Sequence, residues 1–203
     1  MPALIVRELK VGYNGPVIDG LSFEVFDGEF IGIIGPNGSG KTTLIKAILG
    51  ILKPFSGEVL IYDFPPRAGR KYVAYMPQDM NFEPWFPARV FDVVLMGRYN
   101  GGFGYTREDK ERAMMALELV GMAGKKDRRI GELSCGEMRR VLFARALVRE
   151  GRMLLLDEPF SYIEEGMRER MREILESLRG KKTILLVSHE SFIDFDRVIE
   201  LGR

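Results

Sequence analysis

A glycine-rich run near the start of the sequence ends in a lysine and threonines. It reads GPNGSGKT over positions 35–42 and matches the pattern G-x-x-x-x-G-K-[ST]. Backbone N–H groups in such a run can surround phosphate oxygens, the lysine can reach the terminal phosphates, and the hydroxyl of Thr42 can bind Mg²⁺. A plain glycine turn is the alternative. The expected phosphate-binding residues are Gly35, Pro36, Asn37, Gly38, Ser39, Gly40, Lys41, Thr42 and Thr43.

Two acidic residues follow a second apolar run, MLLLDEP, at positions 153–159. Asp157 stands at the carboxyl end of a predicted buried strand, where ligands of open α/β sheets collect, and is an expected Mg²⁺ ligand. Glu158 could accept a proton from a water that attacks the γ-phosphate. The alternative is a helix N-cap with negative charge at the positive end of the helix dipole. Beside a phosphate-binding loop, we favour the catalytic interpretation.

Two residue types that occur once each also follow predicted strands. Gln78 is the only glutamine and follows VAYMP, and His189 is the only histidine and follows TILLVS. A lone histidine is usually structural or exposed. Phosphoryl transfer, however, needs charge stabilisation from several sides, so we expect both residues near the phosphates.

The stretch ELSCGEMRR, at positions 132–140, predicts the start of a helix. Ser134 and Glu137 have the spacing of a capping box. Gly136 lies inside the first helical turn, where glycine costs about 1 kcal/mol relative to alanine. The glycine therefore indicates that another group comes close to this backbone.

The elements that must position these residues alternate along the chain. Short apolar segments with turn residues between them predict antiparallel strands over residues 3–26 and 57–76. FIGIIG, at 30–35, predicts a strand buried on both faces that leads into a helix, and residues 84–148 are mostly helical, with Thr106 capping a helix. Strand 153–157, an amphipathic helix and strand 183–188 predict a right-handed parallel crossover. The fold class is therefore α/β.

Composition restricts the function. The 203 residues carry a net charge of +1, which gives no strong electrostatic footprint for nucleic acid. We interpret the run Lys125, Lys126, Arg128, Arg129 as solvated charge, with a binding patch as the alternative. A single cysteine and the absence of a signal peptide point to a reducing interior. No apolar run reaches the ~18 residues of a spanning helix. Little sequence follows TILLVSH, so we expect no carboxy-terminal regulatory domain.

Five motifs of this sequence occur in an order that resembles a known protein family. GPNGSGKTT, YMPQ, LSCGE, LLLDEP and LLVSH resemble the motifs of the ATP-binding subunits of ABC transporters over nearly the whole chain. The resemblance implies a P-loop NTPase core of the ABC ATPase type, an antiparallel β subdomain and an inserted helical subdomain at about residues 80–150. Residues 1–203 would form a single ABC ATP-binding domain, with ATP and Mg²⁺ as cofactors.

The same resemblance implies a shared site. In that family two copies pair head to tail, and the signature sequence of each, usually LSGGQ, closes over the γ-phosphate that its partner holds. Ser134 would hydrogen-bond that phosphate, Gly136 would let the backbone approach, and Glu137 would belong to the same nucleotide contact. The loop Ser161–Glu164 would cross the dimer interface.

Further roles follow only from the resemblance. Tyr13 would stack on adenine with Val17 beside it, although a tyrosine that anchors a strand edge is the alternative. Gln78 would contact Mg²⁺ or the attacking water, and His189 would touch the γ-phosphate and orient the water together with Glu158.

Three positions depart from the family pattern. Cys135 stands where the signature usually has its first glycine, Glu137 where it usually has glutamine, and Glu164 where the crossing loop usually has aspartate. We expect hydrolysis to survive all three changes.

Residues 85–109 look like a stretch of the zinc and manganese uptake branch, and iron-chelate and cobalamin importers carry similar stretches. We therefore expect an ATPase that drives metal-ion or metal-chelate import. Its partners would be a second copy of itself, a polytopic membrane permease and an extracytoplasmic solute-binding protein, at the cytoplasmic face of the cell membrane. The aromatic residues Phe82, Trp85 and Phe86 would suit a contact surface for such a partner, and ordinary packing inside the subdomain is the alternative. A stand-alone soluble ABC ATPase that remodels protein, Fe–S or nucleic acid is the rival function, and a P-loop kinase or GTPase is the third.

Overall fold

The chain divides into two compact units. A computed structural model describes residues 1–78, 82–83, 85–99, 101–102, 104–188 and 193–202. Unit 1 comprises Met1–Val73, Gly151–Asp157 and Leu178–Arg203, and unit 2 comprises Ala74–Glu150 and Glu158–Ser177. Unit 2 thus contains the predicted helical subdomain at about 80–150 and also residues 158–177, which that prediction did not include.

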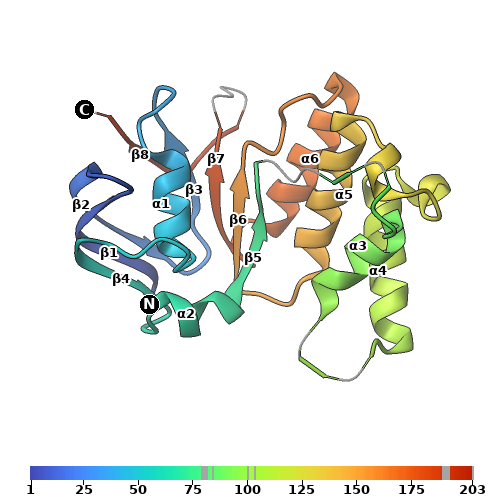
Figure 1. The fold of residues 1–203 in the computed structure, drawn as a ribbon, viewed down its shortest axis with the longest axis horizontal. Helices are drawn as coiled ribbons and strands as arrows, with labels where there is room; N and C mark the ends of the chain where they lie inside the picture. The colour runs from blue at the N-terminus through green and yellow to red at the C-terminus, as the bar shows by residue number, and fades with distance from the viewer. Residues whose placement is uncertain (79–81, 84, 100, 103, 189–192, 203) are drawn as a thin grey trace. The chain divides into compact units, whose positions relative to one another are not determined.

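An antiparallel sheet opens unit 1 (Figure 1). Its described strands are β1 (Pro2–Gly12), β2 (Pro16–Phe26) and β4 (Ser56–Ile61), in the order β2-β1-β4. The prediction for residues 3–26 is confirmed. The prediction for 57–76 is wrong in one respect, because β5 (Val73–Met76) is not a strand of this sheet. Helix α2 (Pro66–Gly69) and a 3₁₀ turn (Arg70–Tyr72) separate β4 from β5, so the two do not form a hairpin.

A parallel sheet forms the rest of the unit 1 core. Strands β6 (Met153–Asp157), β7 (Thr183–Val187), β3 (Phe30–Ile34) and β8 (Arg197–Glu200) lie side by side in that order. Every residue of β6 and β7 is buried, which explains their continuous apolar sequences. Residue pairs such as Leu155 and Leu185 confirm the predicted parallel pairing of these two strands.

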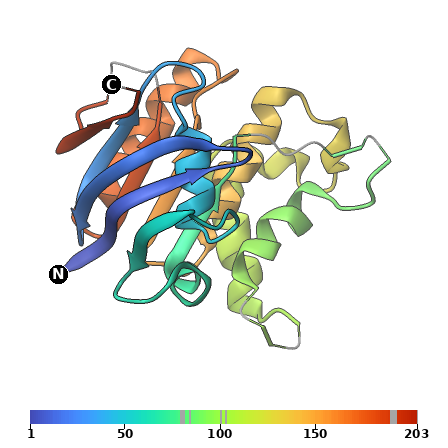
Figure 2. The same cartoon turned by 60° about the vertical axis from the view of Figure 1, so that its left-hand side comes forward.

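Helix α1 (Lys41–Ile48) follows β3 and contacts β1, β2 and β4 of the antiparallel sheet (Figure 2). Its buried face includes Leu44, Ile45 and Ile48. The helix is therefore held by apolar packing along its length, which fixes the loop that precedes it.

Unit 2 is built on helices that pack against one another. Helices α3 (Val90–Leu95), α4 (Arg107–Leu119) and α5 (Cys135–Val148) make mutual contacts, and α6 (Glu165–Leu178) follows later in the chain. Short 3₁₀ turns lie at Met96–Arg98, Ala123–Lys125 and Ile130–Glu132. Thr106 caps α4 as predicted, because its hydroxyl accepts a hydrogen bond from the Asp109 N–H at 3.1 Å.

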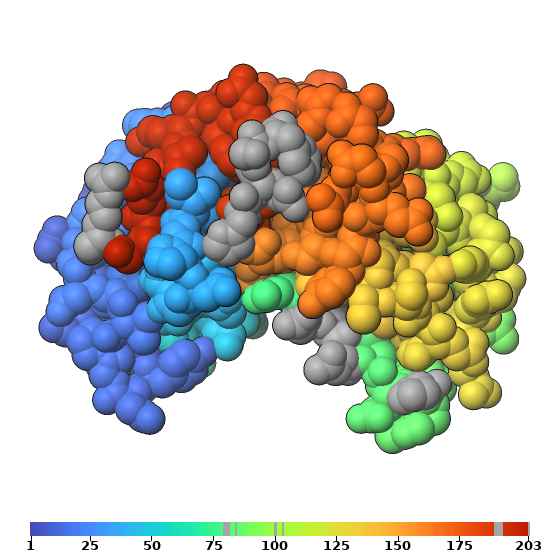
Figure 3. Space-filling model, turned by 90° about the horizontal axis from the view of Figure 1, so that it is seen from above, coloured from blue at the N-terminus to red at the C-terminus, as the bar shows by residue number. Residues whose placement is uncertain are grey.

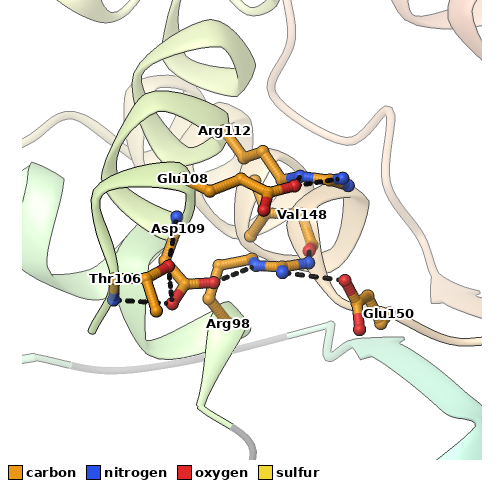
Figure 4. Close-up of polar contacts among 7 residues, drawn as sticks. All are labelled: Arg98, Thr106, Glu108, Asp109, Arg112, Val148 and Glu150. Atoms are coloured by element: carbon orange, nitrogen blue, oxygen red, sulfur yellow. Dashed lines mark hydrogen bonds and ion pairs between the residues drawn. The ribbon is translucent and has the colours of Figure 1, made fainter. Parts of the chain in front are cut away.

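One buried arginine joins three segments of unit 2 (Figure 4). Arg98 donates to the Asp109 carboxylate at 2.8 Å, to the Val148 carbonyl oxygen at 3.1 Å and to the Glu150 carboxylate at 2.8 Å. The side chain of Arg98 is only 9% exposed. This fork therefore ties the turn after α3 to the first turn of α4 and the end of α5.

None of the helices in the described part of the chain has the length and apolar character that crossing a membrane requires.

Candidate functional site

The predicted phosphate loop of unit 1 lies between a buried strand and a helix, as expected. Strand β3 ends at Ile34, the loop runs to Gly40, and α1 begins at Lys41. Gly38 and Gly40 have φ of 83° and 98°, in the left-handed region that favours glycine. A Cβ at Gly40 would also lie 2.9 Å from Cγ1 of Ile18. Close approach to β2 and backbone conformation together explain a glycine at this position.

Lys41 turns back over its own loop. Its ammonium donates to the carbonyl oxygens of Gly35 at 2.6 Å and Pro36 at 3.0 Å. These acceptors are backbone groups of the loop that a phosphate would enter, so the charge already stands at the predicted site. Thr42, the next residue, is half-buried in the first turn of α1.

Ser39 carries a buried polar atom with an unused hydrogen-bonding capacity. Among the described residues no hydrogen-bond partner of its buried Oγ is found. A Cβ at Gly35 would lie 2.6 Å from this Oγ, so the absence of a side chain there leaves the hydroxyl its space. Buried polar groups normally have partners, and an unsatisfied one needs an explanation, for which a ligand that binds there is one. The loop therefore fits a bound phosphate group.

Asp157 is the last residue of β6 and is 1% exposed. The carboxyl ends of β6 and β3 point to the same edge of the parallel sheet, and the phosphate loop follows β3 at that edge. A buried carboxylate there, together with the Thr42 hydroxyl, offers oxygen ligands of the kind that Mg²⁺ prefers. The residues present thus fit the predicted metal.

Glu158 follows at once with φ of 52°, a conformation that is uncommon for a residue with a side chain. Helix α6 begins only at Glu165, so neither Asp157 nor Glu158 lies in a helix N-cap, and that alternative is wrong. In unit 2, the Arg139 guanidinium donates to the Glu158 carbonyl oxygen at 3.0 Å and lies over the Tyr162 ring at 5.7 Å. Arg139 is therefore a neighbour of Glu158 that the sequence prediction missed, because nothing in the sequence distinguishes it from the adjacent Arg140.

The predicted capping box at the start of α5 is present. Ser134 Oγ accepts from the Glu137 N–H at 3.3 Å, and the Glu137 carboxylate accepts from the Ser134 N–H at 2.9 Å. The other Glu137 oxygen pairs with the Lys125 ammonium. The hydrogen bond from Lys125, followed by that from the Ser134 backbone, lowers the pKa of Glu137 to about 2. Lys125 thus has a specific acidic partner although 39% of its side chain is exposed, and the interpretation of this basic run as solvated charge stays a prediction.

The signature turn and the predicted crossing loop share one hollow in the surface of unit 2. Its volume is about 280 Å³, and residues 134–137, 140, 162–164 and 167 line it. In the space-filling view the yellow and orange residues of these segments lie next to each other (Figure 3). Cys135 and Tyr162 are exposed there, and a Cβ at Gly136 would lie 2.5 Å from the Tyr162 carbonyl oxygen. The structure thus brings the signature residues together with the loop Ser161–Glu164.

Tyr13 lies in the turn between β1 and β2, and Val17 is the second residue of β2, with 57% and 46% of their surface exposed. Lys46 of α1 donates to the Tyr13 hydroxyl at 2.8 Å, and its ammonium lies 5.4 Å from the ring centroid. The exposure of the tyrosine agrees better with a stacking surface than with an anchor in a strand edge.

The last two predicted residues follow strands of the core. Gln78 is exposed shortly after β5 and belongs to unit 2. His189 lies outside the described residues.

Comparison with known proteins agrees with this arrangement. The family model described as ABC transporter matches residues 18–161. The zinc transport system ATP-binding protein TroB of Treponema pallidum is 41% identical over 209 residues, which cover 98% of this chain and 78% of that protein. The manganese transport system ATP-binding protein MntB of Listeria monocytogenes is 38% identical over 191 residues, with coverage of 91% and 79%.

A solved structure extends the likeness to the fold. The crystal structure of a nucleotide-free ATP-binding cassette from an ABC transporter has a TM-score of 0.82 at 28% identity, over 99% of this chain and 88% of that chain. The predicted fold class is confirmed, and the chain belongs to the ABC transporter family as one of its ATP-binding subunits.

Proposed function

We propose that this chain is the ATPase of an importer for metal ions or metal chelates, and that it works as a head-to-tail dimer around two Mg-ATP. One observation supports the proposed transported solute: relatives that are 41% and 38% identical over nearly the whole chain are named for zinc and manganese transport. A polytopic membrane permease and an extracytoplasmic solute-binding protein complete the proposed system. The chain then acts at the cytoplasmic face of the membrane, through its permease.

Nucleotide binding in unit 1 begins with the phosphate loop. The backbone N–H groups of residues 37–43 surround the phosphate oxygens, and Lys41 exchanges its two carbonyl partners for the terminal phosphates. Ser39 gains a partner for its buried hydroxyl. Tyr13 supplies a ring for the adenine, with Val17 beside it; the exposure of both side chains supports this role.

We assign Mg²⁺ binding to Thr42, Asp157 and Gln78. When bound, the ion neutralises charge that develops on the β- and γ-phosphate oxygens. Asp157 contributes a negative charge from the end of a fully buried strand, which fixes the carboxylate in one place. Gln78 lies on the segment that leads into the helices of unit 2, so it is also the residue that would report nucleotide occupancy to them.

Glu158 acts as general base on the attacking water, and His189 orients the same water. The bond from Arg139 to the Glu158 carbonyl oxygen supports this assignment, because it fixes the backbone that carries the base. Gln78 would contact this water or the Mg²⁺.

The signature turn completes the site of a second copy. Ser134 Oγ already accepts a bond from the Glu137 N–H, so its O–H proton is left to donate to the partner's γ-phosphate. The amino end of α5 adds the positive end of a helix dipole. Gly136 belongs to the same contact, as does Glu137 through the capping box that it forms with Ser134, and a two-fold pair yields two such composite sites.

Replacement of Glu158 by Gln tests the mechanism. The variant should bind ATP, lose at least 100-fold in turnover, the scale of general-base catalysis, and accumulate as a dimer with nucleotide. Glu165→Gln is the matched control, because Glu165 is an exposed residue at the start of α6, and it should hydrolyse ATP at the wild-type rate. A fully active Glu158→Gln variant would overturn the general-base assignment.

Uptake measurements test the cargo and separate the rival function. Cells without this gene should take up less labelled Zn²⁺, Mn²⁺ or chelated iron, and the wild-type gene, but not the Glu158→Gln form, should restore uptake. A stand-alone remodelling ATPase would leave uptake of all three unchanged and would not co-purify with a membrane permease under gentle solubilisation.

A further inference from the structure

Glu137 places a full negative charge in the first turn of α5, at the end of the helix that is proposed to face a partner's phosphate. The pKa of its carboxyl is lowered to about 2, so the group is ionised at every physiological pH and protonation cannot remove the charge. An uncompensated carboxylate would repel an anionic nucleotide. The chain must therefore neutralise this charge by other means.

The structure supplies a cation for this carboxylate. Lys125, at the end of the 3₁₀ turn Ala123–Lys125, pairs with one Glu137 oxygen, and the Ser134 N–H donates to the other at 2.9 Å. The Glu137 side chain is only 14% exposed, while that of Lys125 is 39% exposed. Both oxygens are thus held on the side of the capping box, and the Ser134 hydroxyl keeps its proton for donation.

The backbone holds Lys125 in place for this role. Its N–H donates to the Met122 carbonyl oxygen at 3.0 Å, and its own carbonyl oxygen accepts from the Arg128 N–H at 3.0 Å. The adjacent Lys126 instead lies 3.9 Å from the Asp127 carboxylate, in a looser and more exposed pair. Two neighbouring lysines therefore differ in what they face, and only Lys125 faces the signature turn.

We propose that Lys125 is a positioning residue for the signature turn: its ammonium cancels the charge of Glu137 and holds that carboxylate in the capping box, so that Ser134 and the end of α5 can receive a phosphate. This inference rests on the proposed function of the turn. It also gives a reason for the cation beside position 137, since the glutamine that the family usually has there is neutral and would need none.

A double-mutant cycle tests the proposal. Lys125→Met should raise the KM for Mg-ATP and the concentration needed for nucleotide-dependent dimerisation about tenfold at low salt, and added salt should reduce the defect because it screens the charge. In a Glu137→Gln background the same lysine substitution should change neither quantity, because no carboxylate remains to be neutralised. Lys125→Arg keeps the charge and should retain near wild-type values. Lys126→Met is the matched control and should behave as wild type.

Each outcome discriminates. A Lys125→Met variant with unchanged KM and unchanged dimerisation overturns the proposal. So does a Lys125→Met substitution that raises KM as much in the Glu137→Gln background as in the wild type. A variant that only melts at a lower temperature, with no change in KM, overturns it as well. Ser134→Ala distinguishes this failure from that of the proposed function. If Ser134→Ala lowers turnover and Lys125→Met does not, only the role of Lys125 is wrong; if Ser134→Ala is also silent, the signature turn itself lacks the proposed role.

Discussion

The carbonyl oxygen of Tyr162 lies against Gly136, and a Cβ at Gly136 would stand 2.5 Å from it. Tyr162 itself has φ of 61°, a conformation that costs free energy for a residue with a side chain. Both residues belong to unit 2, where they join the first turn of α5 to the loop Ser161–Glu164. This contact within one chain is therefore enough to explain the glycine at position 136. The family resemblance explains the same glycine by the approach of a partner's phosphate.

Gly136→Ala should disturb this contact. The new methyl group has to displace a backbone carbonyl, and we expect the free energy of unfolding to fall by about 1–3 kcal/mol, with reduced ATP turnover because the loop moves. Gly166→Ala is the matched control: Gly166 is the second residue of α6, as Gly136 is of α5, and nothing lies within 4 Å of a Cβ there. Chemical denaturation and steady-state hydrolysis measure both effects. Equal stability of the two variants would contradict the prediction.

Ser39→Ala should stabilise the nucleotide-free protein. The substitution removes a buried hydroxyl for which no partner is found among the described residues, and a cost of about 1 kcal/mol disappears with it. The melting temperature should then rise by roughly 2–4 °C, whereas the further rise on adding Mg-ATP should shrink. Ser22→Ala is the control, because Ser22 Oγ is bonded to Glu8 in two ways and loses both bonds. A nucleotide-induced rise as large as that of the wild type would show that Ser39 does not contact the phosphate.

Local patterns allowed much of the fold and site to be predicted. The phosphate loop needs glycines and a lysine at fixed spacing, the cap at Thr106 stands next to the helix that it begins, and the capping box at Ser134 depends on a residue three positions away. Buried strands such as β6 and β7 follow from uninterrupted apolar runs. Interactions whose partners lie close in the sequence are therefore the ones that the sequence reveals.

The parts that could not be predicted depend on residues far apart in the chain. Lys125 is 12 positions from Glu137, Arg139 is 19 from Glu158, and Lys46 is 33 from Tyr13. No periodicity relates the members of such pairs, because the packing of separate elements brings them together. The extent of unit 2 depends on such contacts as well, since residues 158–177 join it although they follow residue 150 only after a strand of unit 1.

Arg98→Met should destabilise unit 2 strongly. The nearly buried side chain bonds to Asp109, to Glu150 and to the Val148 carbonyl oxygen, and its loss leaves Asp109 in place without its cation (Figure 4). We expect the melting temperature to fall by roughly 5–10 °C, because a buried ion pair that loses one partner is costly. Arg107→Met removes an exposed pair with Glu111 and should change the melting temperature by less than about 2 °C. Similar losses in the two variants would show that the Arg98 fork does not hold the helices together.

The same fork predicts how acid acts on this unit. Arg98, and then the Thr106 N–H, lower the pKa of Asp109 from an ordinary value of 3.8 to about 2. A carboxyl whose pKa is lower in the folded state stabilises the fold above its unfolded pKa and loses that contribution as pH falls toward the folded value. Wild type should therefore exceed Asp109→Asn in stability at pH 7, and the difference should shrink between about pH 4 and pH 2. Chemical denaturation of both proteins over this range measures the difference while other titrating groups cancel. In an Arg98→Met background, most of the pH dependence of this stability difference should vanish, because Arg98 is the first cause of the lowered pKa. If the difference between wild type and Asp109→Asn stays constant with pH, the Arg98–Asp109 pair is not ionised as the geometry requires.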